Sequence, residues 1–181
     1  MEKVEPIRSA EKINQMKGEL LKSGLRNYLL FQLGINTGFR VSDLLRLKVE
    51  DVRGKTHIKI KEKKTGKRKK AFINSRLKED IDRFTHNLND EEYLFQSQKG
   101  SNKPITRVQA YRVLRNAAET IRLENIGTHT LRKTFGYHHY KTHKDVALLQ
   151  ELFNHAAPSV TLKYIGINQD MMDQSLENFY L

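Results

Sequence analysis

Cysteine is missing from this chain of 181 residues, and proline occurs only three times. Without cysteine, disulfide bonds and metal sites built on thiolates are excluded. No apolar run approaches the roughly 20 residues that a membrane span requires, and the N-terminal stretch has no hydrophobic signal region. We therefore expect no membrane partner and a cytoplasmic location.

Acidic residues are in the minority, because 21 Asp and Glu face 33 Lys and Arg and leave a net charge of +12. Such an excess favours a polyanionic partner such as nucleic acid. Solvated basic faces are also common, so the charge alone does not decide between the two interpretations. The length suits one domain, or one and a half, and is sufficient to bury a hydrophobic core.

The spacing of apolar residues predicts a mainly helical fold with one small hairpin. Apolar stripes of helical period predict helices over about 10–23, 25–37, 41–47, 75–88, 106–121, 129–141, 144–153 and 158–164. In the helix over 106–121 the stripe is expected to place the following residues inward: Val108, Tyr111, Leu114, Ala118 and Ile121. Thr128 is expected to cap the helix that begins at His129. Gly38 is expected to end the helix over 25–37 with a positive φ.

A strand-like alternation over 57–61 and a second strand around 71–73 flank the turn Lys64 to Lys67, which predicts a β-hairpin. Eight of the twelve residues from Lys59 to Lys70 are basic. An edge hairpin kept soluble by lysines has this composition, and so does a hairpin that enters a DNA groove. The candidate DNA-binding residues are Lys59, Lys61, Lys63, Lys67, Arg68, Lys69 and Lys70.

Residues suited to phosphate chemistry occur in four stretches: TGFRVSDLL, KKTGK, THTLRKTF and LFNHAAPSVTLKY. They place Arg40, Lys64, His129, Arg132, His155 and Tyr164 at fixed intervals. His129 and Arg132 share one helix face in a first turn, where free N–H groups and the helix dipole favour an anion. Taken singly, Arg40 and the His-x-x-Arg pair are each more typical of residues that cap their own loops.

Together these stretches resemble the tyrosine recombinases, the phage integrase family, whose motifs they match in order over positions 37–164. The resemblance implies an α+β, mainly α-helical catalytic domain over residues 1–181, with a small antiparallel β-sheet or hairpin. Family members usually carry a helical DNA-binding domain before this one, so we expect a fragment or a truncated relative. Asn154 stands where the family usually has glycine, and it tolerates the left-handed conformation that ends a helix.

The resemblance implies a site-specific DNA recombinase or integrase of bacterial or phage origin that cleaves and rejoins strands through a 3′-phosphotyrosine. The implied catalytic residues are Arg40, Lys64, His129, Arg132, His155 and Tyr164, with Asp43 in support. Tyr164 is the expected nucleophile and Lys64 the expected general acid, with Lys63 or Lys67 as alternatives if the hairpin register differs. No metal and no ATP or other cofactor is expected, since two arginines can supply the positive charge that metal ions supply in nucleases.

A tyrosine suits this chemistry because a phenol, with a pKa of about 10, leaves more readily than serine would. Two guanidiniums suit it because their planar fork matches paired phosphate oxygens. Tyr137 and Tyr140 lie close to the His-x-x-Arg stretch and are the rival nucleophiles.

The implied partners are double-stranded DNA and further copies of the chain, which form a tetramer in the family's synaptic complex. The tail 165–181 holds three acids and no Lys or Arg, and Met171, Met172, Leu176 and Phe179 can form an apolar face there. Such a tail either packs on its own core or docks on a neighbour, as is common in the family.

Three other functions remain open. They are a type IB topoisomerase, a catalytically inactive DNA-binding module, and a metal-dependent hydrolase that uses histidines. His138, His139 and His143 have no metal-binding spacing, so we interpret them as core or surface residues.

Overall fold

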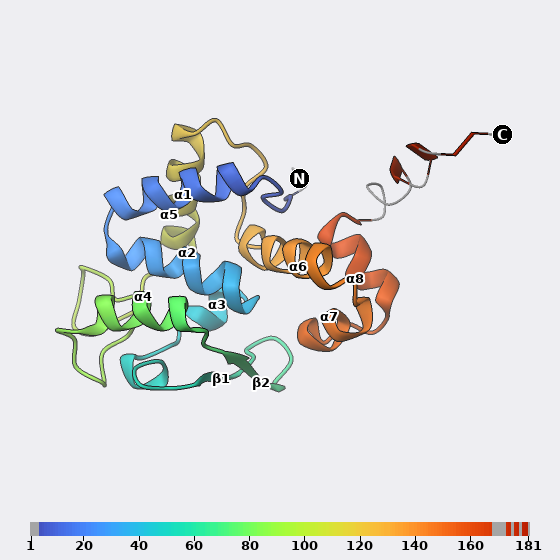
Figure 1. The fold of residues 1–181 in the computed structure, drawn as a ribbon. Coiled ribbons are helices and arrows are strands. Elements are labelled where there is room, and N and C mark those ends of the chain that lie inside the picture. Colours follow the sequence, from blue (N-terminus) through green and yellow to red (C-terminus); the bar gives the residue numbers. More distant parts are fainter. Residues whose placement is uncertain (1–3, 168–172, 175, 178, 181) are drawn as a thin grey trace.

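The computed structural model describes residues 4–167, 173–174, 176–177 and 179–180. Helices dominate it, and the described residues contain one two-stranded antiparallel sheet (Figure 1). The helices are α1 (Ala10–Lys22), α2 (Leu25–Thr37), α3 (Val41–Leu44), α4 (Ser75–Thr85), α5 (Arg107–Thr120), α6 (Thr130–His143), α7 (Val146–Phe153) and α8 (Pro158–Ile165), with the 3-10 turn η1 at Val49–Asp51. The predicted mainly helical fold with a small hairpin is confirmed. Within the described ranges, no helix is long and apolar enough to cross a membrane.

Helix α2 is the centre of the larger hydrophobic core. Its residues Leu29, Leu30 and Phe31 are fully buried, and it packs against α1, α4 and α6 (Figure 1). A smaller cluster forms between α6, α7 and α8, and its members include Tyr137, Tyr140, Leu149, Phe153 and Ile165. Helix α6 therefore connects the two clusters.

The hairpin pairs β1 (His57–Lys61) with β2 (Arg68–Phe72), in a register that places His57 opposite Phe72 and Lys61 opposite Arg68. β2 begins earlier than the predicted strand around 71–73. The reason is a tight turn, in which Glu62 N–H donates to the Lys67 carbonyl and Gly66 N–H donates to the Glu62 carbonyl. The basic turn therefore projects from a fully paired hairpin.

Two details of the predicted helices are wrong. Val108 is 58% exposed, whereas Leu114 and Ala118 are buried as predicted, together with Ala110 and Ala117. The inner face of α5, which packs against α1, is therefore rotated away from Val108. Thr128 does not cap α6, since His129 is its N-cap residue. The Thr130 hydroxyl accepts a hydrogen bond from Gly127 N–H instead and closes the preceding turn.

Two predicted helices end earlier than their apolar stripes suggested. α4 ends at Thr85 because Arg53 donates to the carbonyls of Thr85 and Leu88. α3 ends at Leu44, where a hydrogen-bonded turn leads into η1. The ending of α4 therefore depends on a contact from outside the helix.

Glycine permits the close approach of α2 and α6. A Cβ built on Gly34 would lie 2.8 Å from the Leu131 Cβ atom, whereas a Cβ on exposed Gly18 in α1 would meet nothing within 4 Å. The spacing of α2 and α6 therefore depends on the missing side chain of Gly34.

We expect Gly34→Ala to destabilise the fold by roughly 1–3 kcal/mol, because overpacking outweighs the better helix propensity of alanine. Gly18→Ala is the matched control and should stabilise it by roughly 0.5–1 kcal/mol, since only propensity changes. Urea unfolding of both variants measures the difference. If the two substitutions changed the unfolding free energy equally, α2 and α6 would have room for a methyl group between them.

Candidate active site

Arg40 lies at the corner between α2 and α3. α2 ends at Gly38, which has the predicted left-handed conformation (φ 64°), and Arg40 is the N-cap residue of α3. The Arg40 guanidinium pairs with Glu62 Oε1 at 2.5 Å. Asp43, in the same short helix, is buried and accepts a hydrogen bond from Lys63 N–H at 2.9 Å. The corner therefore holds the hairpin turn through two acidic contacts.

Arg132, in the first turn of α6, is only 2% exposed. Its Nη1 donates to the Gly38 carbonyl at 2.7 Å and its Nη2 donates to the Phe153 carbonyl at 2.8 Å. The guanidinium also lies 4.2 Å from the centre of the Phe153 ring. Burial lowers the pKa of Arg132 from its ordinary value, and the Tyr164 phenol is the strongest opposing influence. A guanidinium stays protonated at neutral pH, so Arg132 places a fixed positive charge between two helix ends.

His155 follows Asn154, whose left-handed conformation (φ 56°) ends α7 as predicted. Its Nδ1 lies 3.0 Å from the Thr161 hydroxyl oxygen. Burial, then the charges of Arg132 and Lys69, lower the pKa of His155 to about 4. The ring is thus neutral at pH 7. When the Thr161 hydroxyl donates to Nδ1, the ring keeps its proton on Nε2 and can donate it to an anion.

The Tyr164 hydroxyl lies 3.2 Å from Nδ1 of His129. Burial raises the pKa of Tyr164, although the charges of Arg132 and Arg40 oppose the rise. Partial desolvation and the charge of Arg132 lower the pKa of His129. A phenol that is harder to ionise therefore sits beside a neutral imidazole that can accept its proton.

Lys64 lies in the hairpin turn at the mouth of a cleft of about 540 Å³. The cleft is lined by Arg40, Val41, Ser42, Lys63, Lys64, Arg107, Thr128 and His129. Arg107, the first residue of α5, had no signal in the sequence that marked it as part of the site. Lys64 and Arg40 also lower the pKa of His129 through their charges. The six predicted catalytic residues thus gather in one region, from the hairpin, the α3 corner, α6 and the α7–α8 segment.

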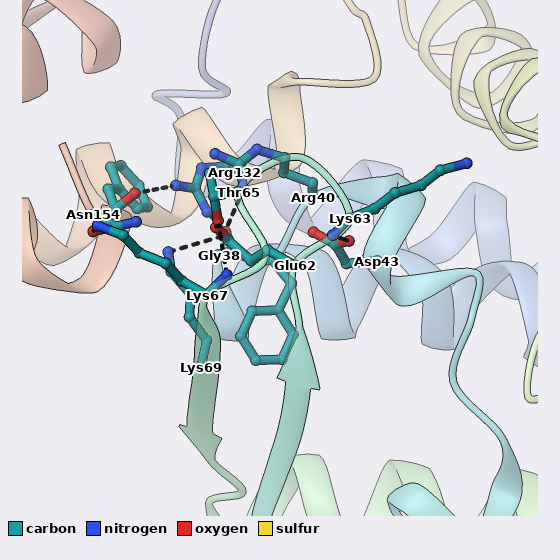
Figure 2. A network of polar contacts seen from close by, with 12 residues as sticks. Gly38, Arg40, Asp43, Glu62, Lys63, Thr65, Lys67, Lys69, Arg132 and Asn154 are labelled. Atoms are coloured by element: carbon teal, nitrogen blue, oxygen red, sulfur yellow. Dashed lines mark hydrogen bonds and ion pairs between the residues drawn. The ribbon is translucent and has the colours of Figure 1, made fainter.

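Glu62 and Lys69 also belong to this region, although their part in it was not predicted. Glu62 is 2% exposed, and its Oε1 pairs with Lys69 Nζ at 3.1 Å as well as with Arg40 (Figure 2). The Thr65 hydroxyl donates to Oε2 at 2.6 Å. Burial alone would raise the pKa of Glu62, but hydrogen bonds from Thr65 and Lys69 and the nearby positive charges lower it. The signal in the sequence was a single acid within a basic run.

Apart from Lys69, the basic residues of the hairpin are exposed. Lys69 turns inward, and the exposed residues are Lys59, Lys61, Lys63, Lys64, Lys67, Arg68 and Lys70. Burial lowers the pKa of Lys69, and the charge of Arg132 adds to this. The hairpin therefore presents one basic surface to solvent and one lysine to the interior of the site.

The three histidines of α6 and the two rival tyrosines make packing or hydrogen-bond contacts within the fold. His138 Nε2 lies 2.8 Å from the Ile7 carbonyl oxygen. The rings of His139 and His143 are in contact, with centres 4.6 Å apart and planes tilted by 48°. In the part of the chain that the structure describes, no group of three or more metal-ligating side chains occurs. Tyr137 and Tyr140 are buried in the smaller core cluster.

A family model and the related sequences indicate the same protein family. The model described as "Phage integrase family" matches residues 8–171. The chain is 52% identical over 167 residues to the "Probable integrase/recombinase YoeC" of Bacillus subtilis, with 92% of each chain covered. It is 26% identical over 170 residues to "Tyrosine recombinase XerA" of Pyrococcus furiosus, covering 92% of this chain and 59% of that protein.

Solved structures share the fold. The crystal structure of XerA recombinase matches with a TM-score of 0.77 at 19% identity, over 98% of this chain and 66% of that one. XerH site-specific recombinase bound to palindromic difH substrate matches with a TM-score of 0.74 at 22% identity, over 97% of this chain and 54% of that one. The chain therefore spans about half to two thirds of these recombinases.

We expect His155 to stay uncharged down to about pH 4, well below the ordinary value of 6.5. The unfolded chain binds a proton below about pH 6.5, whereas the folded chain resists it. The stability that neutral His155 contributes is therefore complete above pH 6.5 and is lost as the pH falls toward 4. NMR titration of the imidazole nitrogens measures the midpoint, and a value at or above 6 would contradict it. His155→Gln should flatten the fall in unfolding free energy over the same range.

Proposed function

Because this chain belongs to the phage integrase family, we propose that it is a site-specific recombinase that cleaves and rejoins double-stranded DNA. The observation that carries the proposal is the gathering of Tyr164, His129 and Arg132 beside a cleft lined by Arg40 and Lys64. We place this activity in the bacterial cytoplasm, whether the gene is of bacterial or of phage origin.

In this proposal Arg40 and Arg132 bind the scissile phosphate. Their charges meet the negative charge that grows on the phosphate oxygens as a fifth ligand joins the phosphorus. Arg132 uses one N–H at each of two nitrogens for carbonyl contacts, and a guanidinium has five N–H donors, so donors remain for phosphate. Neutral His155 donates its Nε2 proton to a non-bridging oxygen.

Tyr164 is the proposed nucleophile and His129 its base. The phenol gives its proton to Nδ1 of His129 as its oxygen bonds to phosphorus, and the bond from phosphorus to the 5′ oxygen breaks. Lys64 gives a proton to that leaving oxygen. The 3′-phosphotyrosine keeps the bond energy, so a 5′-hydroxyl can attack it and rejoin a strand with no ATP. The arginines supply the charge that metal ions supply elsewhere.

The exposed face of the hairpin is the proposed DNA contact, through the lysines and arginine at its surface. Such contacts release counterions, so binding should weaken steeply with salt. We further propose that copies of the chain assemble on DNA as a tetramer. Its relative in fold, lambda integrase, is known as a tetramer bound to a Holliday junction.

The tail 165–181 is the proposed contact between neighbouring copies. Leu176 and Phe179 are 64% and 62% exposed, as residues that dock on another copy need to be. Met171 and Met172, the other half of the predicted apolar face, lie outside the described residues.

The other candidate functions differ in measurable ways. A type IB topoisomerase would relax a supercoiled plasmid without joining two sites. An inactive module would bind DNA without covalent attachment. A metal-dependent hydrolase would lose its activity in EDTA.

We expect covalent capture of DNA to require Tyr164. A substrate can be selected by incubating the protein with nicked duplexes of randomised sequence and sequencing those that stay attached after denaturation. On that duplex Tyr164→Phe should give no covalent complex, while Tyr137→Phe and Tyr140→Phe should give one, because their rings are buried away from the cleft. A denaturing gel of radiolabelled DNA shows the result. Covalent attachment of DNA to Tyr164→Phe would contradict the assignment of Tyr164 as the nucleophile.

We expect Lys64→Met to slow cleavage by roughly 10²- to 10⁴-fold, the usual contribution of a general acid. A duplex with sulfur in place of the 5′ bridging oxygen has a leaving group that needs no proton. On that duplex Lys64→Met should cleave at nearly the wild-type rate. Lys63→Met is the control. If Lys63→Met or Lys67→Met, instead of Lys64→Met, shows the full loss together with the sulfur rescue, the role moves to that lysine.

A further inference from the structure

Two lysines of the hairpin reach the C-terminal end of α7. Lys67 Nζ donates to Asn154 Oδ1 at 2.7 Å, across 87 residues of sequence. Lys69 Nζ donates to the Leu152 carbonyl at 2.7 Å, across 83 residues. Figure 2 shows Lys67 and Lys69 on the side of the hairpin that faces Asn154. The hairpin is therefore tied to the segment that continues into His155.

The end of α7 suits such contacts for a physical reason. The last carbonyls of a helix have no partner within it and carry the negative end of its dipole. An ammonium group placed there is stabilised, and its hydrogen bond to an oxygen is charge-assisted. The lysines thus use the hairpin's surplus charge to dock on a complementary helix end.

The backbone and the side chain of Asn154 have two different roles, which a substitution can separate. Its left-handed conformation (φ 56°) ends α7, and glycine adopts that conformation more readily than any other residue. Only the side chain of Asn154, however, brings the oxygen that Lys67 contacts. Replacement by glycine should therefore keep the helix ending and remove the contact.

The hairpin turn is held from two sides. On one side Asp43 accepts a hydrogen bond from Lys63 N–H at 2.9 Å, and on the other Asn154 holds Lys67. Lys64 lies between these two anchors, next to Lys63 and three residues before Lys67. Without the Asn154 side chain, Asp43 and Arg40 still hold the start of the turn and Lys69 still holds β2, but Lys67 loses its contact with α7. A displacement of about 1 Å is enough to cost a catalytic group much of its effect.

We propose that Asn154 is a positioning residue, which acts through Lys67 to fix Lys64 relative to His155 and the scissile phosphate. This inference rests on the proposed recombinase function and on Lys64 as the general acid. Asn154 touches none of the reacting atoms. Its effect is confined to the step in which the 5′ oxygen receives its proton.

The test compares Asn154→Gly with Asn125→Gly on the duplex selected by the wild-type protein. Asn125 is exposed in the loop before α6 and has the same left-handed conformation (φ 60°), so the two variants make the same chemical change. Each protein is assayed with an oxygen-bridged and with a 5′-sulfur-bridged scissile phosphate. Thermal unfolding of both variants confirms that they fold as the wild type does.

We expect Asn154→Gly to cleave the oxygen-bridged duplex roughly three- to tenfold more slowly than wild type, a part of what a general acid contributes. On the sulfur-bridged duplex it should match wild type within about twofold, because no proton is needed there. Asn125→Gly should match wild type on both duplexes.

Two results would overturn the inference. One is an Asn154→Gly protein as fast as wild type on the oxygen-bridged duplex, and the other is an equal loss on both duplexes, which would place its effect outside proton transfer. The result with the wild-type protein distinguishes failure of this inference from failure of the proposed function. If wild type attaches to no duplex in the randomised pool, the recombinase proposal fails before the variants are compared.

Discussion

The buried guanidinium of Arg132 is the interaction on which the rest of the site depends. A buried charge is costly unless it is hydrogen-bonded, and Arg132 is satisfied by the carbonyls of Gly38 and Phe153. These carbonyls lie at the C-terminal ends of α2 and α7, where helix carbonyls lack partners of their own. Because Arg40 and His155 each follow one of these helix ends by two residues, satisfying Arg132 also fixes the backbone that carries them.

Local signals in the sequence predicted the parts of the site that depend on a few neighbouring residues. Gly38 and Asn154 were expected to end their helices in the left-handed conformation, and both do. The turn from Lys64 to Lys67 was expected between two strands, and it lies there. The family resemblance then identified which side chains to examine, and the structure brings them to one region.

Contacts between distant segments could not be predicted in the same way. In the sequence Glu62 is marked only as the single acid in a basic run, and it is the packing of the hairpin against the α3 corner that brings it to Arg40. The inward turn of Lys69 depends on a carbonyl 83 residues away. The error at Val108 has a similar origin, because the face of α5 that is buried is decided by its packing against distant helices such as α1.

The concentration of positive charge around the cleft has a consequence for the free protein. Among the described residues, Asp43 and Glu62 are the buried acids, while, in addition to burial, the charges of Arg132 and Arg40 lower the pKa of Lys69 and the charge of Arg40 lowers the pKa of Arg132. Without DNA these cations repel one another, so the side chains needed for catalysis lower the stability of the free protein. The same cluster of side chains therefore favours activity and lowers thermal stability. A sulfate or phosphate ion in the cleft would relieve that repulsion and protect the empty enzyme.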